Sequence, residues 1–137
     1  MIQETLVYQT AGRGTTNITR DVQRLVASSG VRTGLAHLFV QHTSASLMLC
    51  ENADPAVRQD LESFMQRIAP DGTRAYAHAD EGPDDMPAHI RSVLTGMDLT
   101  VPISEGRCAL GTWQGIYLWE HRAHAHRRRV VVTISGE

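Results

Sequence analysis

The chain contains no lysine: all 13 of its basic side chains are arginine, set against 15 acidic ones. This absence excludes catalysis through a lysine Schiff base. A net charge of −2, with histidine neutral, also argues against broad electrostatic binding to nucleic acid. The run from Arg127 to Arg129 offers at most a local anion site, since such runs more often lie solvated or alternate in a strand. We therefore expect no nucleic-acid partner.

Cysteines are few and long apolar runs are missing. Cys50 and Cys108 are the only cysteines, which gives no disulfide framework and fits a reducing compartment. No apolar run approaches the roughly 20 residues that a membrane helix needs. The N-terminal stretch MIQETLVYQT lacks the basic start and apolar middle of a secretory signal. We expect a cytoplasmic protein without membrane contact.

Length and pattern predict one domain that spans residues 1–137. Residues 17–26 are expected to form a short strand that leads into a helix. Two further helices are expected, one from Pro55 to Ile68 with Asp54 as its capping residue and one from Pro87 to Leu94. Strands are expected at 5–9, 35–43, 47–50, 98–103, 107–110, 115–121 and 128–135. Because most of these strands follow one another without a helix between them, the pattern predicts an α+β fold with a mainly antiparallel sheet or sandwich.

The stretch QHTSAS, residues 41–46, interrupts an apolar strand with polar side chains. Strand alternation places His42 on the same face as Leu38 and Val40, so we expect the imidazole to point toward the interior. Thr43 and Ser44 follow it directly and offer hydroxyl groups to an anionic group. Taken alone, a histidine on a strand face is more often hydrogen-bonded in the core than bound to a metal.

Two other histidines have polar neighbours that favour metal binding. His78 lies in an acidic loop, and His89 follows Asp85 by four residues, a helical spacing that lets the carboxylate orient the imidazole. Neutral imidazole is the commonest protein ligand of metal ions, and a catalytic ion typically has three protein ligands. The separation of His42, His78 and His89 fits no closed metal motif, so only the fold can bring them together.

The other polar candidates have competing interpretations. We expect His121, His124 and His126 to form a solvated cluster in a hairpin loop. In the phrase GTWQGIYLWE, Gln114 offers a two-sided amide to a ligand and Glu120 ends a strand, but tryptophans in such a strand also suit a subunit interface.

Four phrases in this order resemble one known family. They are QHTSASLMLCENADPAVRQDL, YAHADEGPDDMPAHI, LTGMDLTVPISEGRCALGTWQGIYLWEHR and RRRVVVTI. The chain is similar to the YjbQ-like proteins, often called secondary thiamine-phosphate synthases, from about Thr5 to Ile134. The resemblance implies a seven-stranded, mainly antiparallel β-sandwich with two to three helices, assembled as a homotrimer.

The resemblance also implies a set of site residues. His42, His78 and His89 are the implied metal ligands, and Glu120 and Arg128 are further pocket residues. One position departs from the family pattern, because Asp85 stands where asparagine is common and adds negative charge near the metal.

These signals lead to two functional hypotheses. The first is a metal-dependent enzyme acting on a small phosphorylated substrate, with thiamine phosphate synthase activity as a side reaction. In it Ser44, Glu120 and Arg128 are catalytic, and Thr43 and Gln114 bind the ligand. A histidine-rich site favours a zinc-like divalent ion over magnesium, which prefers oxygen ligands. The alternative is a non-catalytic trimer that binds a small ligand or a partner.

Overall fold

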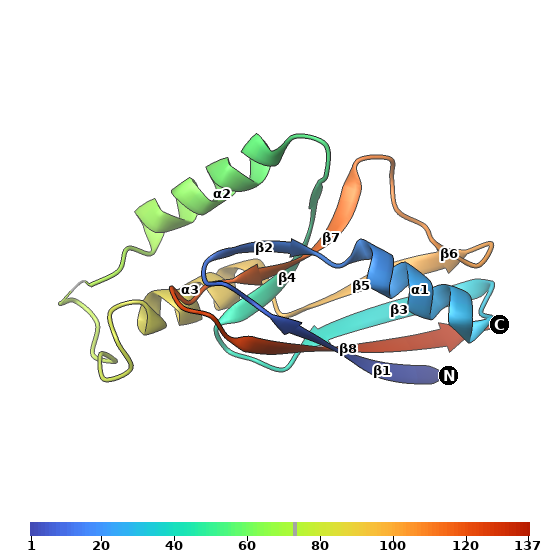
Figure 1. The fold of residues 1–137 in the computed structure, drawn as a ribbon, viewed down its shortest axis with the longest axis horizontal. Coiled ribbons are helices and arrows are strands. Elements are labelled where there is room, and N and C mark those ends of the chain that lie inside the picture. Colours follow the sequence, from blue (N-terminus) through green and yellow to red (C-terminus); the bar gives the residue numbers. More distant parts are fainter. Residues whose placement is uncertain (73) are drawn as a thin grey trace.

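The computed structural model describes residues 1–72 and 74–137 and places two antiparallel sheets together with helices around them (Figure 1). The strands are β1 (Ile2–Gln9), β2 (Gly14–Asn17), β3 (Thr33–Val40), β4 (Ala45–Glu51), β5 (Asp98–Ser104), β6 (Arg107–Cys108), β7 (Gln114–Glu120) and β8 (Arg127–Gly136). The helices are α1 (Thr19–Ser29), α2 (Pro55–Ile68) and α3 (Asp85–Thr95). The predicted α+β class is confirmed, but the seven-stranded count is wrong, because the described residues form sheets of five and three strands.

The core lies between the two sheets. The larger sheet has the order β1-β8-β3-β5-β6, and the smaller has the order β2-β7-β4. Alternation along β3 and β8 turns Leu38, Val40 and Val132 toward the core, where they meet Leu47 and Leu118 of the smaller sheet. The intervening residues of β3 and β8 face away from this core.

Local sequence signals set the ends of several elements. The side chain of Asp54 accepts a hydrogen bond from the Ala56 amide at 2.9 Å, and Pro55 occupies the first turn of α2. Gly30 ends α1 in the left-handed conformation, with φ of 73°. Gly106, with φ of 77°, lies in the turn between β5 and β6. The predicted cap at Asp54 is confirmed.

Other boundaries differ from the predictions. The strand expected over 35–43 ends at Val40, so alternation does not carry His42 into the core. The third helix begins at Asp85 rather than Pro87, and the strand expected over 107–110 shortens to the two residues of β6. Residue 73, within the loop expected over 73–87, lies outside the described residues.

The polar candidates gather at one end of the molecule. Figure 1 shows α3 at the end away from both termini, near the beginning of β8 and the end of β7. Ala45, the first residue of β4, pairs with Glu120, the last residue of β7, and its carbonyl accepts a hydrogen bond from Ser92 of α3. None of the helices in the described ranges is both long and apolar enough to cross a membrane.

Candidate functional site

Three side chains of metal-ligating type converge at the beginning of α3. They are His78, Asp85 and His89, which we call the histidine cluster, and their ligand atoms all lie within 4.8 Å of one another. His78 comes from the loop before α3, whereas Asp85 and His89 lie about one turn apart on the helix. The expected contact between Asp85 and His89 is present, with 3.1 Å between Oδ2 and Nε2.

The hydrogen bonds of His89 leave one ring nitrogen facing a carboxylate. Its Nδ1 lies 3.0 Å from the carbonyl oxygen of Thr43, so Nδ1 carries a proton and donates it. In a neutral ring Nε2 is then an acceptor, yet it faces Asp85 Oδ2, which also lies 2.6 Å from His78 Nε2. Two acceptors face each other stably only when a proton or a metal ion lies between them.

Arg122 keeps the neighbouring carboxylates charged. Its Nη1 lies 2.9 Å from Asp85 Oδ1, and its Nε donates to Asp84 Oδ2 at 2.8 Å. Burial raises the pKa of Asp84, but the hydrogen bonds from Arg122 and from the Ala123 amide, together with the charge of Arg122, outweigh it and lower the pKa to about 2. For Asp85, burial also raises the pKa, whereas the hydrogen bond with His78 and the charge of Arg122 lower it below its ordinary value. Both acids are ionised at neutral pH.

A cavity of about 500 Å³ adjoins the histidine cluster. Its lining residues are Gly72, Arg74, Tyr76, His78, Ala79, Gly82, Pro83 and Met86. Arg74 is an exposed cation, and Tyr76 is a half-buried aromatic ring. The cavity therefore presents a guanidinium, a phenol ring and an imidazole to any molecule that enters it.

A second polar group, which we call the Glu120 cluster, is buried at the same end of the fold. It consists of Thr10, Ser44, Glu120 and Arg128. Arg128 Nε donates to Glu120 Oε1 at 2.7 Å, and Arg128 Nη2 donates to Glu120 Oε2 and, at 2.9 Å, to Ser44 Oγ. The structure thus brings together the three residues that the sequence marked as catalytic.

The acceptor positions of Glu120 are all occupied. Oε1 accepts from Thr10 Oγ1 at 2.7 Å and from Arg128, while Oε2 accepts from Arg128 and from the Arg122 amide at 3.1 Å. Burial raises the pKa of Glu120, but the hydrogen bonds from Arg128, Thr10 and the Arg122 amide, together with the charge of Arg128, outweigh it and lower the pKa below the ordinary value. A carboxylate in this state is suited to hold Arg128 in place rather than to accept a proton.

His42 stays apart from the histidine cluster. Its Nε2 accepts a hydrogen bond from the Arg129 amide at 2.8 Å, so the neutral ring carries its proton on Nδ1 and neither nitrogen offers a lone pair to an ion. Burial, followed by the charge of Arg128, lowers the pKa of His42. Of the three predicted histidine ligands, the structure brings His78 and His89 together and leaves His42 elsewhere.

The two predicted ligand-binding residues also lie in different places. Thr43 is exposed, and its contact with the histidine cluster runs through its backbone carbonyl. Gln114 begins β7, at the opposite end of that strand from Glu120. There its Oε1 accepts a hydrogen bond from the Gly111 amide at 2.8 Å and stabilises a local turn.

His121 corrects the prediction of a solvated histidine loop. It directly follows β7 and is 0% exposed, and its Nε2 lies 2.8 Å from Ser46 Oγ. Burial lowers its pKa to about 3. His124 is exposed as predicted, but alternation along β7 puts His121 on the side of Trp119, against α2 and α3.

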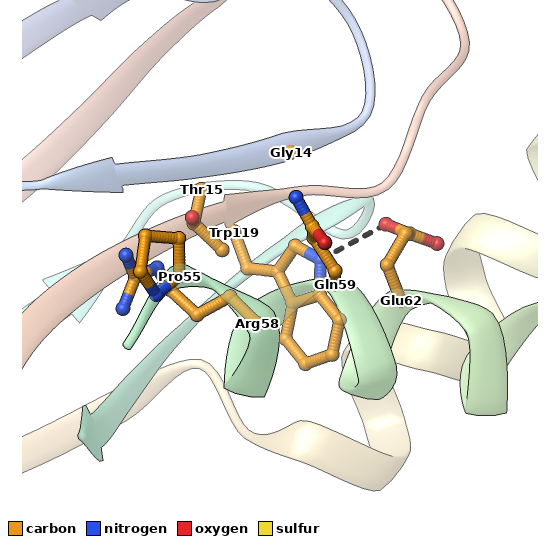
Figure 2. Close-up of a pocket in the computed structure, with 7 residues that line it drawn as sticks. All are labelled: Gly14, Thr15, Pro55, Arg58, Gln59, Glu62 and Trp119. Carbon is orange, nitrogen blue, oxygen red and sulfur yellow. Dashed lines mark hydrogen bonds between the residues drawn. The ribbon is translucent and has the colours of Figure 1, made fainter. Parts of the chain in front are cut away.

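A second cavity, of about 430 Å³, lies between α2 and the smaller sheet. Figure 2 shows Trp119 among Arg58, Gln59 and Glu62 of α2, with its indole Nε1 donating to Glu62 at 3.2 Å. Trp119 is thus covered within one chain, although the sequence left open whether a partner subunit would cover it.

Comparison with known proteins identifies close relatives over the whole chain. The family model for the UPF0047 protein YjbQ-like matches residues 3–137. A UPF0047 protein of Synechocystis sp. is 53% identical over 135 residues, which cover 98% of this chain and 92% of that protein. UPF0047 protein YjbQ of Escherichia coli O157:H7 is 47% identical over 136 residues, which cover 98% of each chain.

Solved structures share the fold. A conserved protein of Thermus thermophilus matches with a TM-score of 0.86 at 36% identity, covering 96% of this chain and 99% of that one. A Clostridium acetobutylicum protein of the YjbQ/UPF0047 family matches with a TM-score of 0.86 at 35% identity, covering 98% of this chain and 100% of that one. The matches cover both sheets and all three helices.

Proposed function

The chain belongs to the YjbQ-like UPF0047 family, and we propose that it is a metal-dependent enzyme acting on a small phosphorylated molecule. The observation that carries the proposal is the ring of His89. Its Nδ1 proton is committed to the Thr43 carbonyl, while its Nε2 and the Oδ2 of Asp85 face each other at 3.1 Å. A divalent ion held by His78, Asp85 and His89 would give both facing acceptors a partner.

The donor set favours a zinc-like ion. His78 and His89 supply imidazole nitrogens and Asp85 supplies a carboxylate, a combination found at catalytic zinc sites that keep an open position. Magnesium prefers oxygen ligands and water. The Thr43 carbonyl that holds His89 Nδ1 is the kind of outer partner that orients metal-bound histidines.

The adjoining cavity supports a phosphorylated substrate. Arg74 lines it and carries a charge that complements a phosphate, while Tyr76 offers a ring face to an aromatic or apolar group. In this proposal Glu120 and Arg128 are positioning residues, because their hydrogen bonds are already saturated. They hold Ser44 and the preceding Thr43 carbonyl, on which the orientation of His89 depends.

Thiamine phosphate synthesis is proposed as a side activity. In that reaction a ring nitrogen of the thiazole phosphate forms a bond to the pyrimidine methylene carbon, the carbon–oxygen bond to pyrophosphate breaks, and pyrophosphate leaves with the electron pair. The leaving group needs cationic stabilisation, which Arg74 and a divalent ion supply. We expect slow turnover that falls further in Arg74→Ala.

Metal analysis of protein prepared without an affinity tag tests the proposal. We expect about one zinc-like ion per chain in the wild type and loss of that ion in His78→Ala and His89→Ala. His124→Ala is the matched control, since His124 is exposed in a loop, and His42→Ala should also retain the ion. Wild-type protein without stoichiometric metal, or equal metal in all four variants, contradicts the proposal.

The alternative, a non-catalytic trimeric binding protein, draws support from the outer face of the larger sheet. Val7, Leu35 and Phe39 lie on strands of that sheet and are 46%, 50% and 46% exposed. Large apolar side chains gathered on one sheet face are typical of a subunit interface. We propose that this face forms a homotrimer under either hypothesis.

Sedimentation velocity tests the trimer separately from the metal. We expect a species of about three times the 15.1 kDa chain mass, converted to monomer by Phe39→Glu. Phe64→Glu, at an exposed position of α2, is the control and should leave the trimer intact. A trimer with stoichiometric metal but no turnover of any phosphorylated compound favours the binding-protein alternative.

A further inference from the structure

Arg91 of α3 is fully buried but uses only part of its hydrogen-bonding capacity. Its Nη1 donates to Glu62 Oε2 at 2.6 Å, and the residue is 0% exposed. Its Nε and Nη2 are buried, and none of the described residues supplies a hydrogen-bond partner for either. A buried guanidinium with two unpaired donors is costly, because those donors have given up water without a replacement.

Glu62 cannot satisfy the two free donors as it is placed. One of its oxygens accepts from Arg91 Nη1, and the other accepts from the Trp119 indole at 3.2 Å (Figure 2). The carboxylate therefore bridges α3 and β7 instead of forming a two-point contact with the guanidinium. Because Glu62 bonds only to Nη1 of Arg91, the edge of the guanidinium formed by Nε and Nη2 has no hydrogen-bond partner among the described residues.

The unused edge has a specific shape. Nε and Nη2 of an arginine lie on the same side of the planar guanidinium and donate in parallel. This fork matches two oxygens of one carboxylate or phosphate group. The unsatisfied atoms of Arg91 are thus the pair that binds an oxyanion through two points.

The arginine lines a cavity large enough for such a group. The cavity has a volume of about 340 Å³, and its lining residues are Arg13, Gln66, Pro70, Asp71 and Arg91. Asp71 does not leave free negative charge there, because its two oxygens accept from Arg13 at 2.5 and 2.6 Å. Arg91 is therefore the lining residue whose guanidinium keeps unpaired, fully buried donors.

A second buried atom near this cavity also lacks a partner. The Nδ1 of His121 is buried without a hydrogen bond to any described residue. The backbone carbonyl of His121 accepts from Arg13 Nε at 2.9 Å, which ties the residue to the wall of the cavity. Arg91 and His121 together leave three unpaired nitrogens in one polar region between α2, α3 and β7.

We propose that the Arg91 cavity binds a small oxyanion, with two oxygens of a phosphate or carboxylate group on Nε and Nη2 of Arg91. The site is separate from the histidine cluster, shares no residue with it and requires no metal. Phosphate and carboxylate use the same fork, so the free anion and an anionic group of a small metabolite are both accommodated by this chemistry.

Calorimetric titration of the full-length protein tests the site. Inorganic phosphate and acetate are titrated at constant ionic strength, with chloride as the reference, into protein that has been stripped of metal with EDTA and then dialysed free of the chelator. We expect saturable binding of one anion per chain to the wild type, and about tenfold to hundredfold weaker binding to Arg91→Lys, which keeps the charge but loses the fork. Arg24→Lys, at an exposed arginine paired with Asp21, is the control and should bind as the wild type does.

The titration distinguishes a phosphate ligand from a carboxylate ligand, and it tests the oxyanion site independently of the proposed metal site. Preference for phosphate identifies a phosphorylated ligand, and preference for acetate identifies a carboxylate. His89→Ala should lose the metal but bind the anion normally, so failure at one site does not imply failure at the other. Absence of saturable binding, or equal affinity in Arg91→Lys, overturns the oxyanion site.

A crystal structure of the wild type grown in phosphate decides the matter even if Arg91→Lys is unstable. We expect two oxygens of one anion within hydrogen-bond distance of Nε and Nη2. A lone water or an empty cavity at these atoms overturns the proposal.

Discussion

The histidine cluster and the Glu120 cluster lie at the same end of the fold, and both contact Arg122. Their hydrogen bonds are nevertheless arranged in opposite ways. The Arg122 amide donates to Glu120, while its guanidinium contacts Asp85. Every acceptor position of Glu120 is filled by a donor, whereas His89 and Asp85 present two acceptors to each other. The first arrangement needs nothing more, and the second needs a proton or a metal ion between the two acceptors.

The two clusters also differ in how far their side chains are exposed to solvent. Glu120 and Arg128 are 1% and 3% exposed, while the side chains of His78 and His89 are 46% and 31% exposed. A saturated, buried ion pair fixes neighbouring backbone, but a half-exposed group with an unfilled position can exchange ligands. The difference separates a structural support from a reactive site.

Removing one partner of the buried pair should have the largest effect. Arg128→Met leaves the charge of Glu120 buried without compensation, so we expect the free energy of unfolding to fall by about 3 to 5 kcal/mol. Urea denaturation measures the change. Arg127→Met, at the exposed preceding position, should cost less than about 0.5 kcal/mol. Equal losses in both variants would remove the structural role of the Glu120 cluster.

Adding metal should stabilise only a protein with an intact histidine cluster. With free zinc about 100-fold above its Kd, binding to the folded state adds about 2.7 kcal/mol to the free energy of unfolding. Thermal denaturation in zinc and in EDTA gives the difference for the wild type. His89→Ala should show the same Tm in both solutions, and a wild type that also shows no difference contradicts the contrast between the clusters.

Acid should weaken the fold through His121, which is buried beside Glu120. Burial lowers its pKa from 6.5 to about 3, so the unfolded chain takes up a proton below pH 6.5 that the folded chain refuses. Stability is therefore lost as the pH falls, by about 2 kcal/mol from this residue between pH 7 and pH 5. Denaturation curves at both pH values measure the loss.

Two substitutions isolate that contribution. His121→Gln lacks the imidazole and should show a loss smaller by about 2 kcal/mol over the same pH interval, whatever its absolute stability. His124→Gln, at an exposed position, should retain the wild-type loss. An unchanged pH dependence in His121→Gln would assign the acid sensitivity to other groups.

The smallest effects should come from removing the hydroxyls of the neighbouring residues Ser44 and Thr43. Ser44→Ala removes one of several acceptors of Arg128, so we expect a loss of about 1 kcal/mol in the free energy of unfolding. Thr43→Ala should change stability by less than about 0.5 kcal/mol and leave metal content unchanged, since Thr43 contacts His89 through its carbonyl. Metal loss in Thr43→Ala would give its hydroxyl a direct role in the site.

Part of the candidate site could be read from local spacing. Asp85 and His89 are four residues apart on a helix, so their contact followed from helical geometry. His78 joins them through the path of a loop, and no periodicity predicts that path. The strand pattern ended at Val40 instead of continuing through His42, which left this residue outside the group that the family resemblance implied.

The Glu120 cluster shows a different limit. Alternation along β8 indicates that Arg128 and Val130 share a face, but a lone arginine between exposed arginines gave no signal of burial. Its burial depends on Glu120, which lies on β7 in the other sheet. His121 was wrongly predicted to be exposed for a related reason. The packing of α2 and α3 over it cannot be predicted from the sequence of the strand alone.

The sequence by itself determined the capped start of α2 at Asp54, the face that β3 turns to the core and the pairing of Asp85 with His89, since these depend on residues within a few positions. The tertiary structure decided that His78 completes the metal candidate, that Glu120 neutralises Arg128 and that Arg91 keeps an unpaired fork beside a cavity. Such contacts join residues distant in the chain, and only the order of strands in the sheets and the packing of helices upon them brings those residues together.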